Sequence, residues 1–438
     1  MKKQDRKTTR NYYAIVIPSI LAFALAGVYS IVDGFFIGQK LGDAGLASVT
    51  IGYPLAVFIQ AVGTGLGLAG AIRYTVYGAQ GRKKDQEECY TAAVILLVLV
   101  SVVLTALFLA ALYPILAFLG AEGDILEMTA DYVRMLAYGT IFQLLATGLV
   151  PFIRNMGGTT YAMVSMILGF VTNIILDYVL VWWIPLGMSG AALATVIGQA
   201  VTMLAAVGYL LQKRPWMRLP GRETLLNTWG RMARIGAAPF GMTLSPTVTL
   251  VLMNRFLQIY GGEQAVAVYG CIDYVVAIAY MLLQGVGDGS QPLISECYGE
   301  KDIKGARGNR ALAYKTAGVI TAACVVGLFL ARNQIGPLFG ASSVTAAEVG
   351  TRLPLFLGAL LFVAFVRVTS SYCYATERAM LSYVLVYAEP LLSLTAMLTI
   401  PPRLGLDGVW CAIPLAQVVT GIIAAGIKIR VDTTENML

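Results

Sequence analysis

The stretch "LGMSGAALATVIGQAVT", from Leu186 to Thr202, occurs a second time in outline near the other end of the chain. The second copy reads "LGLDGVWCAIPLAQVVT" and runs from Leu404 to Thr420. The two copies align without a gap and share a leucine-glycine start, a second glycine, an alanine, a glutamine and a final valine-threonine. They begin about half of the 438-residue chain apart. This repeat predicts that the chain contains two halves of the same fold.

The composition is that of a membrane protein. Hydrophobic residues make up 58% of the chain and charged residues only 13%, whereas soluble domains carry about 25% charged residues. We expect no cleavable signal peptide, because the basic N-terminus runs into an apolar stretch too long for a signal sequence. The 6 cysteines are scattered without a CxxC pair, and they therefore indicate neither a disulfide framework nor a zinc site.

The apolar segments predict an all-α integral membrane protein with twelve transmembrane helices. A helix needs about 20 mostly apolar residues to cross the hydrocarbon core of a bilayer. The stretches that meet this requirement are 11–39, 45–77, 88–117, 125–152, 158–183, 187–211, 231–260, 264–298, 307–331, 344–374, 379–401 and 405–429.

The distribution of positive charge predicts the orientation of these helices. With the N-terminus in the cytoplasm, most of the 31 lysines and arginines fall in cytoplasmic segments, and only Lys40, Arg332 and Arg403 fall in outer ones. This asymmetry obeys the positive-inside rule. We therefore expect a multi-pass protein of the bacterial cytoplasmic (inner) membrane with both termini in the cytoplasm. The net charge of +7 is explained by contact with anionic membrane lipid, so we expect no nucleic-acid partner.

A polar connection divides the predicted spans into two sets of six. It covers residues 213–230, between an N-terminal lobe of residues 1–212 and a C-terminal lobe of residues 231–438. Because each lobe has an even number of spans, a pseudo-two-fold axis along the membrane normal is expected to relate them. Two such lobes can enclose a cavity that opens to either side in turn, which favours a transporter. The alternative is that the duplication only builds a stable bundle, as in a channel or a scaffold.

Polar residues are rare inside the spans of the N-terminal lobe, and an ionisable one costs at least about 2.5–3.5 kcal/mol at the centre of the bilayer. At a rise of about 1.5 Å per residue, five polar residues lie about 9–15 Å from the outer ends of their helices. These residues are Asp33, Tyr132, Asn173, Asp177 and Thr195. Four helices are therefore expected to bring oxygen-bearing side chains to one level of the lobe.

This set of oxygens fits a cation-coupling site. Asn173 and Asp177 are four residues apart and share one helix face. Carboxylate, amide and hydroxyl oxygens suit a small hard cation, which would be Na⁺ held by Asp33, Asn173, Asp177 and Thr195. They suit a proton equally, because two neighbouring buried carboxylates repel each other when both are ionised. The alternative is a static polar network that only holds the lobe together.

Pro18 precedes Asp33 in the same predicted helix. Proline removes a backbone hydrogen bond and kinks a helix, which a membrane helix tolerates where its neighbours or water satisfy the freed carbonyl. We therefore interpret Pro18 as a conformational hinge, with a static kink as the alternative.

The spans of the C-terminal lobe carry more charge than those of the first lobe. Arg255 and Asp273 lie at similar depth and can form an ion pair, and so can Arg367 and Glu389. We favour a structural role for these charges over contact with a substrate. Two further polar residues, Gln284 and Asp288, are expected to line a vestibule closer to the cytoplasm.

The sequence resembles the multidrug and toxic compound extrusion (MATE) family, and the similarity covers essentially the whole chain. It is carried by "VDGFFIG" at the end of the first span, "TNIILDYVL" in the fifth and "GAALATVIGQ" in the sixth. The DinF-type and related bacterial branches are the most similar. The resemblance implies a cation site formed by Asp33, Tyr132, Asn173, Asp177 and Thr195, with Tyr138 as the alternative tyrosine.

One feature departs from the family pattern. The NorM branch carries acidic residues in helices seven and ten, where this chain has Asn254 and Arg367. Cation coupling is therefore expected to fall on the first lobe.

The resemblance implies a monomeric secondary antiporter that exports small amphipathic, cationic organic compounds in exchange for H⁺ or Na⁺, without a cofactor. The alternative function is a flippase for lipid-linked precursors, although the first lobe offers only Arg134 to hold a pyrophosphate. Enzyme activity is not expected, because the chain has 0 histidines and neither an HExxH nor a Gly-x-Ser-x-Gly motif.

Overall fold

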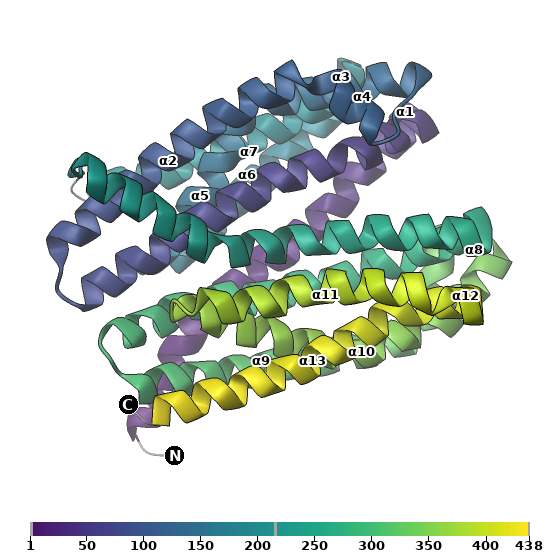
Figure 1. Cartoon of the computed structure of the whole chain (residues 1–438). Coiled ribbons are helices and arrows are strands. Elements are labelled where there is room, and N and C mark those ends of the chain that lie inside the picture. Colours follow the sequence, from purple (N-terminus) through teal and green to yellow (C-terminus); the bar gives the residue numbers. More distant parts are fainter. Residues whose placement is uncertain (1–2, 214–216, 437–438) are drawn as a thin grey trace. The chain divides into compact units, whose positions relative to one another are not determined.

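The computed structural model describes residues 3–213 and 217–436, and within these ranges the secondary structure is entirely helical (Figure 1). The N-terminal half comprises α1 (Lys3–Ala79), α2 (Lys83–Ala110), α3 (Leu112–Phe118), α4 (Gly123–Tyr138), α5 (Thr140–Asn155), α6 (Thr159–Asp177), the π-helix η1 (Tyr178–Trp183) and α7 (Gly187–Lys213). The C-terminal half comprises α8 (Arg222–Gly299), α9 (Ile303–Leu338), α10 (Ser343–Ala375), α11 (Ala379–Thr399), α12 (Pro401–Leu404) and α13 (Leu406–Asn436).

The helices account for the twelve predicted spans. Among the described residues, 10 helices are long and apolar enough to cross a membrane, or 11 if α4 and α5, which meet at a 55° bend, form one span. The 78 residues of α8 far exceed the roughly 20 that one crossing needs. Dividing α8 at its backbone break at Gly262 gives twelve spans in two sets of six.

Two glycines turn the chain back at equivalent places in the two halves. Gly42 in α1 has φ 64° and ψ −157°, and Gly262 in α8 has φ 68° and ψ −166°. This backbone region is open to glycine because it has no Cβ. Each glycine therefore separates two consecutive spans within one long helical segment.

The described helices form two compact units whose bounds differ from the predicted lobes. The N-terminal unit is Leu21–Thr243, and the C-terminal unit combines the residues up to Ile20 with those from Leu244 onward. The start of α1 thus belongs to the C-terminal unit and the start of α8 to the N-terminal unit. The predicted boundary followed the polar connection, whereas packing places the division inside the two long helices.

Close backbone contacts explain this exchange of helix starts. In the N-terminal unit, a Cβ on Gly65 would lie 2.7 Å from the carbonyl oxygen of Gly236, so the two segments touch through their backbones. In the C-terminal unit, a Cβ on Gly285 would lie 2.7 Å from the Cα of Ile20. The glycine-rich stretches of the two halves are therefore sites of close helix packing, as small residues are in other membrane proteins.

Aromatic and aliphatic side chains fill the interior of each unit. In the N-terminal unit, Phe152 is fully buried and packs edge-on against Tyr74 and Tyr90. In the C-terminal unit, Trp410 is fully buried against Tyr269 and Phe356. These cores hold the polar groups described below at fixed positions.

Candidate cation site

Two carboxyl groups meet inside the N-terminal unit. Asp33 comes from α1 and Asp177 is the last residue of α6. Their carboxyl groups lie within hydrogen-bonding reach of each other. One oxygen of Asp33 and both oxygens of Asp177 are buried without a hydrogen-bond partner. Ionised carboxylates only accept hydrogen bonds, so two of them are stable in contact only when a proton or a cation lies between them.

Asn173 adds a fourth buried oxygen of the same kind. Its Nδ2 donates to Oγ1 of Thr195 over 3.3 Å, and the Thr195 hydroxyl in turn donates to the carbonyl oxygen of Ala191 over 3.2 Å. This fixes the orientation of the amide and leaves its Oδ1 buried without a partner. Buried polar atoms without partners are rare in folded proteins, and four of those in the described residues belong to Asp33, Asn173 and Asp177.

Close packing of α6 against α7 brings Asn173 to Thr195. A Cβ on Gly198 would lie 2.7 Å from the carbonyl oxygen of Gly169 and 3.0 Å from the Cβ of Asn173. Gly169 itself leaves room for the hydroxyl of Thr202. The repeated "GAALATVIGQAVT" stretch therefore contributes to the site in two ways. Gly198 allows α7 to pack closely against α6, and Thr195 accepts the hydrogen bond of the Asn173 amide.

The tyrosine of α4 that faces this region is Tyr132. Its side chain is 5% exposed, its ring covers Gly52, and it interacts electrostatically with Asp33 and Asp177. The alternative tyrosine, Tyr138, is 57% exposed. The structure thus brings all five predicted residues together and selects the first of the two tyrosines.

A sixth residue, Tyr29, was missed by the sequence analysis. Its hydroxyl reaches a hydrogen bond with Thr195, and it interacts electrostatically with Asp33, Asp177 and Tyr132. Its ring stacks on Phe170 with 5.1 Å between the centroids. Tyr29 lies four residues before Asp33, so the helical repeat places both on one face of α1 and could have identified it.

The chain changes its helical geometry immediately after this site. The π-helix η1 begins at Tyr178, directly after Asp177. Such turns are uncommon and occur frequently at functional sites. Pro18, by contrast, lies within a helical part of α1, two residues before the division between the units at Ile20. Its role as a hinge remains a prediction.

The donor set of this region fits Na⁺ or a proton better than a multivalent metal. Among the residues that the structure describes, no group of three or more His, Cys, Asp and Glu side chains could hold a metal ion. The two carboxylates are completed by neutral oxygens of Asn173 and Thr195, a set that suits one small hard cation.

One of the predicted ion pairs in the C-terminal unit does not form. Arg255 is exposed and forms no ion pair within the described part of the chain, and Asp273 is in hydrogen-bonding contact with Tyr269. The two residues lie on opposite sides of the break at Gly262, and the aspartate turns towards the buried tyrosine. The predicted Arg255–Asp273 pair is therefore wrong.

Arg367 and Glu389 are linked through other side chains. Arg367 donates to Oε1 of Gln284 over 2.6 Å, and the amide of Gln284 donates to Asp288 over 2.8 Å. Glu389 accepts from Gln417 over 2.9 Å. No direct salt bridge joins Arg367 to Glu389 in the described ranges. Pairing through neutral side chains thus replaces the predicted ion pair.

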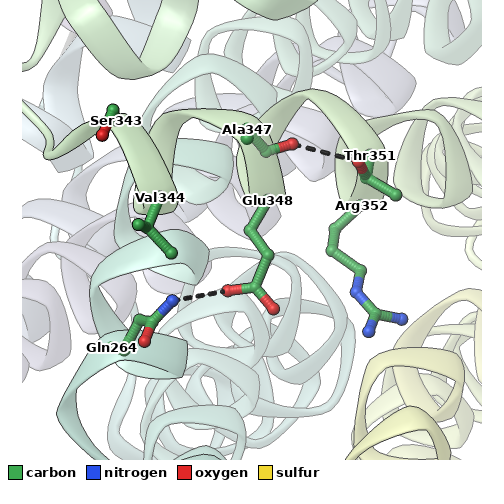
Figure 2. A pocket seen from close by; sticks show the side chains of 7 residues that line it. All are labelled: Gln264, Ser343, Val344, Ala347, Glu348, Thr351 and Arg352. Carbon is green, nitrogen blue, oxygen red and sulfur yellow. Dashed lines mark hydrogen bonds between the residues drawn. The ribbon is translucent and has the colours of Figure 1, made fainter.

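The C-terminal unit also carries an open hollow of about 600 Å³ between α8 and the start of α10. Figure 2 shows Gln264 donating to Glu348 at 3.3 Å, with Arg352 one turn further along α10. Arg352 is itself paired with Asp407. Of the two charged residues that line this hollow, Arg352 is paired with Asp407 and Glu348 accepts a hydrogen bond from a neutral amide, and none of the predicted site residues lines it.

Long apolar helices in two compact units, with two carboxyl groups in contact inside one of them, are typical of a polytopic membrane transporter in the part of the chain that the structure describes. A profile of the MatE family matches residues 18–179 and 240–395. The chain therefore belongs to the MatE family, which confirms the predicted family, the transporter class and the expectation that the protein is not an enzyme.

Known proteins agree with this assignment. The multidrug export protein MepA of Staphylococcus saprophyticus is 29% identical over 343 residues, which cover 76% of this chain and 73% of MepA. MepA of Staphylococcus haemolyticus is 23% identical over 411 residues, or 93% and 90% of the two chains.

Two solved structures share the fold. An outward-facing multidrug resistance MATE family transporter of the MOP superfamily superposes with a TM-score of 0.90 at 23% identity and covers 98% of this chain and 97% of its own. A MOP superfamily transporter from Pyrococcus furiosus superposes with a TM-score of 0.89 at 23% identity and covers 97% and 96%.

Proposed function

We propose that the protein is a secondary antiporter that exports amphipathic, cationic organic compounds in exchange for H⁺ or Na⁺. Family membership and the likeness to multidrug export proteins support the export of such compounds. The coupling to a cation is supported by one observation, the contact between Asp33 and Asp177 without a hydrogen-bond donor.

The bound cation would act on the balance between two conformations. A proton or Na⁺ at Asp33, Asn173, Asp177 and Thr195 would remove the repulsion between the carboxylates and contact oxygens among the four that are buried without a partner. A ligand shifts a conformational equilibrium only through unequal affinity for the two states. We infer that the state in which these helices lie close together is favoured by the cation, and that α1 moves about Pro18 when the cation leaves.

The charge distribution and the membrane spans support a location and an orientation for the protein. We propose a cytoplasmic (inner) membrane location with both termini in the cytoplasm, and a monomer as the transporting unit. The flippase alternative gains no support in the N-terminal unit, because Arg134 is paired with Asp131 at the surface.

Transport by reconstituted protein tests this proposal. Proteoliposomes would be given a proton gradient or a sodium gradient separately, and the uptake of an ethidium-like dye would be measured. We expect one gradient to drive uptake by the wild type and neither to drive uptake by Asp33→Asn. Asp131→Asn is the matched control, because Asp131 lies in the same unit but is exposed and paired at the surface. Full transport by Asp33→Asn would refute the coupling site.

A further inference from the structure

An aromatic cluster joins α1 to η1 next to the candidate cation site. The ring of Phe36 on α1 lies 6.2 Å from that of Tyr178 and 6.5 Å from that of Trp182, measured between centroids. Tyr178 and Trp182 stack on each other within η1, with 6.5 Å between their centroids. Aromatic side chains attract one another at centroid distances of about 4.5–7 Å. Three rings therefore form a direct contact between the two helical segments.

The cluster and the carboxylates lie on the same two segments. Phe36 follows Asp33 by three residues, which places both on one face of α1. Tyr178 directly follows Asp177, and Trp182 lies four residues further along η1. In the proposed orientation, the rings lie on the outer side of both carboxylates. The contact that joins the rings therefore also holds Asp33 near Asp177.

A lysine and a neighbouring helix hold the cluster in place. Nζ of Lys40, about one turn beyond Phe36, lies 5.8 Å from the centre of the Trp182 ring, a distance at which an ammonium group is attracted to the face of an aromatic ring. On its other side η1 packs against α7, because a Cβ on Gly190 would lie only 2.8 Å from the carbonyl oxygen of Leu180. The rings thus hold α1 against a segment that is itself anchored in the N-terminal unit.

The second copy of the repeat lacks both the carboxylate and the aromatic pair. When the gap-free alignment of the two copies is continued towards the N-terminus, Asp177 corresponds to a threonine, Tyr178 to an alanine and Trp182 to an isoleucine, at positions 395, 396 and 400. The aromatic pair is thus present in the copy that carries the carboxylate and absent from the copy that does not. This coincidence favours a role in the site over a role in packing, which both copies need.

We propose that Phe36, Tyr178 and Trp182 form an aromatic clamp that positions the carboxylates of Asp33 and Asp177 and thereby sets the affinity of the site for its driving cation. Two ionised carboxylates repel each other at short distance, so the segments that carry them are pushed apart before a cation binds. The clamp opposes this separation and keeps the oxygens in place for the cation. The three aromatic side chains are positioning residues, because they act through the two carboxylates.

This inference rests on the proposed function, because it concerns the cation site of that antiporter. It adds an explanation of how two like charges are held together before the cation arrives. A site whose geometry is fixed in advance binds more tightly, because less ordering has to occur on binding. Loss of the clamp is therefore expected to weaken cation binding more than it weakens the fold without the cation.

The test is the cation dependence of the thermal midpoint, measured with the purified full-length protein in detergent. A ligand that binds only the folded state raises the midpoint to an extent set by its concentration and dissociation constant. Na⁺ would be titrated at fixed pH, and protons would be titrated by lowering the pH without Na⁺. In Trp182→Leu and in Phe36→Leu, we expect the cation concentration needed for a given rise of the midpoint to increase about tenfold, because aromatic contacts between the two segments are lost.

Each variant has a matched control one residue away. Trp183→Leu changes the neighbouring tryptophan of η1, which is 73% exposed and whose ring contacts Tyr178 but no ring of α1 among the described residues. Phe35→Leu changes the neighbouring phenylalanine of α1, which is 59% exposed. We expect both controls to keep the cation dependence of the wild type. Phe36→Tyr retains the ring and should keep it as well.

A purely structural role would give a different result. Loss of packing alone lowers the midpoint equally with and without the cation. Loss of the clamp lowers it mainly in the presence of the cation, because separation of the segments relieves the repulsion between the carboxylates when no cation is bound. Equal lowering under both conditions in Trp182→Leu and Phe36→Leu would overturn the clamp.

The same titration separates the clamp from the proposed function. A wild-type midpoint that responds to Na⁺ and to pH no more than that of Asp33→Asn would overturn the cation site, and the clamp with it. A stronger response of the wild type, shared without change by Trp182→Leu and Phe36→Leu, would overturn the clamp alone. In the Asp33→Asn background, Trp182→Leu should no longer alter the cation dependence, since one of the two carboxylates that the clamp positions is gone.

Discussion

The two units of the molecule use charge in opposite ways. In the N-terminal unit, the buried carboxylates of Asp33 and Asp177 face each other without a positive group. In the C-terminal unit, the buried carboxylate of Glu435 accepts hydrogen bonds from Arg307, Arg378 and Tyr372. One fold, present twice, thus holds an incomplete charge cluster in one copy and a complete one in the other. We propose that the incomplete cluster binds a diffusible cation, whereas the complete one holds helices in place.

The complete cluster ties the end of α13 to its neighbours. Arg307 lies on α9, Arg378 lies between α10 and α11, and the distance from Nε of Arg307 to Glu435 is 2.7 Å. Asp432, one turn earlier on α13, pairs with Arg310 and with Lys428. Networks of this kind contribute more to the stability of the fold than isolated surface ion pairs do. Here the carboxylate of Glu435 is also shielded from water.

Asp177→Asn is the change with the largest expected effect, and its two consequences have opposite signs. Transport should fall to the background of empty liposomes, because the cation loses a charged ligand. Thermal stability in detergent at neutral pH without Na⁺ should rise by about 1 kcal/mol, or about 2 °C, since asparagine can donate a hydrogen bond to Asp33. Dye uptake and the thermal midpoint measure the two effects. A drop in the midpoint would mean that the carboxylate is a structural group.

Glu435→Gln is the corresponding change in the C-terminal unit, and we expect it to have the opposite effects: a loss of thermal stability and no loss of transport. It leaves Arg307 and Arg378 without their shared carboxylate, and breaking such a buried pair costs about 3–5 kcal/mol. Because both arginines keep about a quarter of their surface exposed, we expect a loss of about 2 kcal/mol, measured as a lower thermal midpoint in detergent.

Transport per folded molecule should survive in Glu435→Gln, because no cation site is touched. Asp85→Asn is a control for the loss of a surface pair, since Asp85 and its partner Arg82 are both more than one third exposed. That control should lie within about 0.5 kcal/mol of the wild type. Equal thermal midpoints for Glu435→Gln and Asp85→Asn would show that the Glu435 cluster does not stabilise the C-terminal unit more than a surface ion pair does.

The geometry of the N-terminal site depends on a glycine contact that can be tested separately from its charges. Gly198→Ala places a methyl group against the backbone of Gly169, and overpacking of this kind costs about 1–3 kcal/mol. It should also weaken cation coupling, because Asn173 and Thr195 are pushed apart. Gly208→Ala is the matched control on α7, since its Cβ would meet nothing closer than 3.8 Å. Thermal midpoints and gradient-driven dye uptake would be measured for both variants. Equal values for Gly198→Ala and Gly208→Ala would show that the glycine contact does not set the geometry of the site.

The spans and the residues of the N-terminal site could be predicted from the sequence, whereas the side-chain pairing in the C-terminal unit could not. The spans and the N-terminal site follow from periodic apolar runs and from rare polar residues at matching depth, so Asp33, Asn173 and Asp177 could be placed beforehand. Depth along a helix gives no information on rotation about its axis. For that reason Arg255 and Asp273 share a level without meeting.

The exchange of helix starts between the units could not be predicted from hydropathy. It depends on backbone contacts such as those of Gly65 and Gly285, and a lipid-facing and a buried apolar residue look alike in the sequence. The polar connection at residues 213–230 lies at the middle of the sequence, whereas the division of packing lies inside α1 and α8.

Tyr29 yields the smallest predicted effect and the finest test of the incomplete cluster. Tyr29→Phe keeps the ring stacked on Phe170 but removes the hydroxyl that contacts Thr195. A hydrogen bond of this kind contributes about 0.5–1.5 kcal/mol, so the driving cation should bind several-fold more weakly while maximal transport persists. The concentration of the driving cation at half-maximal dye uptake measures this change.

Tyr53→Phe serves as the comparison for Tyr29→Phe, because Tyr53 interacts with Tyr132, whereas the described contacts of Thr195 are made by Asn173, Ala191 and Tyr29. If both variants shift the half-maximal concentration equally, the hydroxyl of Tyr29 acts through general polarity and not through Thr195. A shift confined to Tyr29→Phe would place this tyrosine in the shell that orients the Asn173 amide. The incomplete cluster would then have six contributors, with a hydroxyl from α1 holding the threonine of α7 in the position that the cation requires.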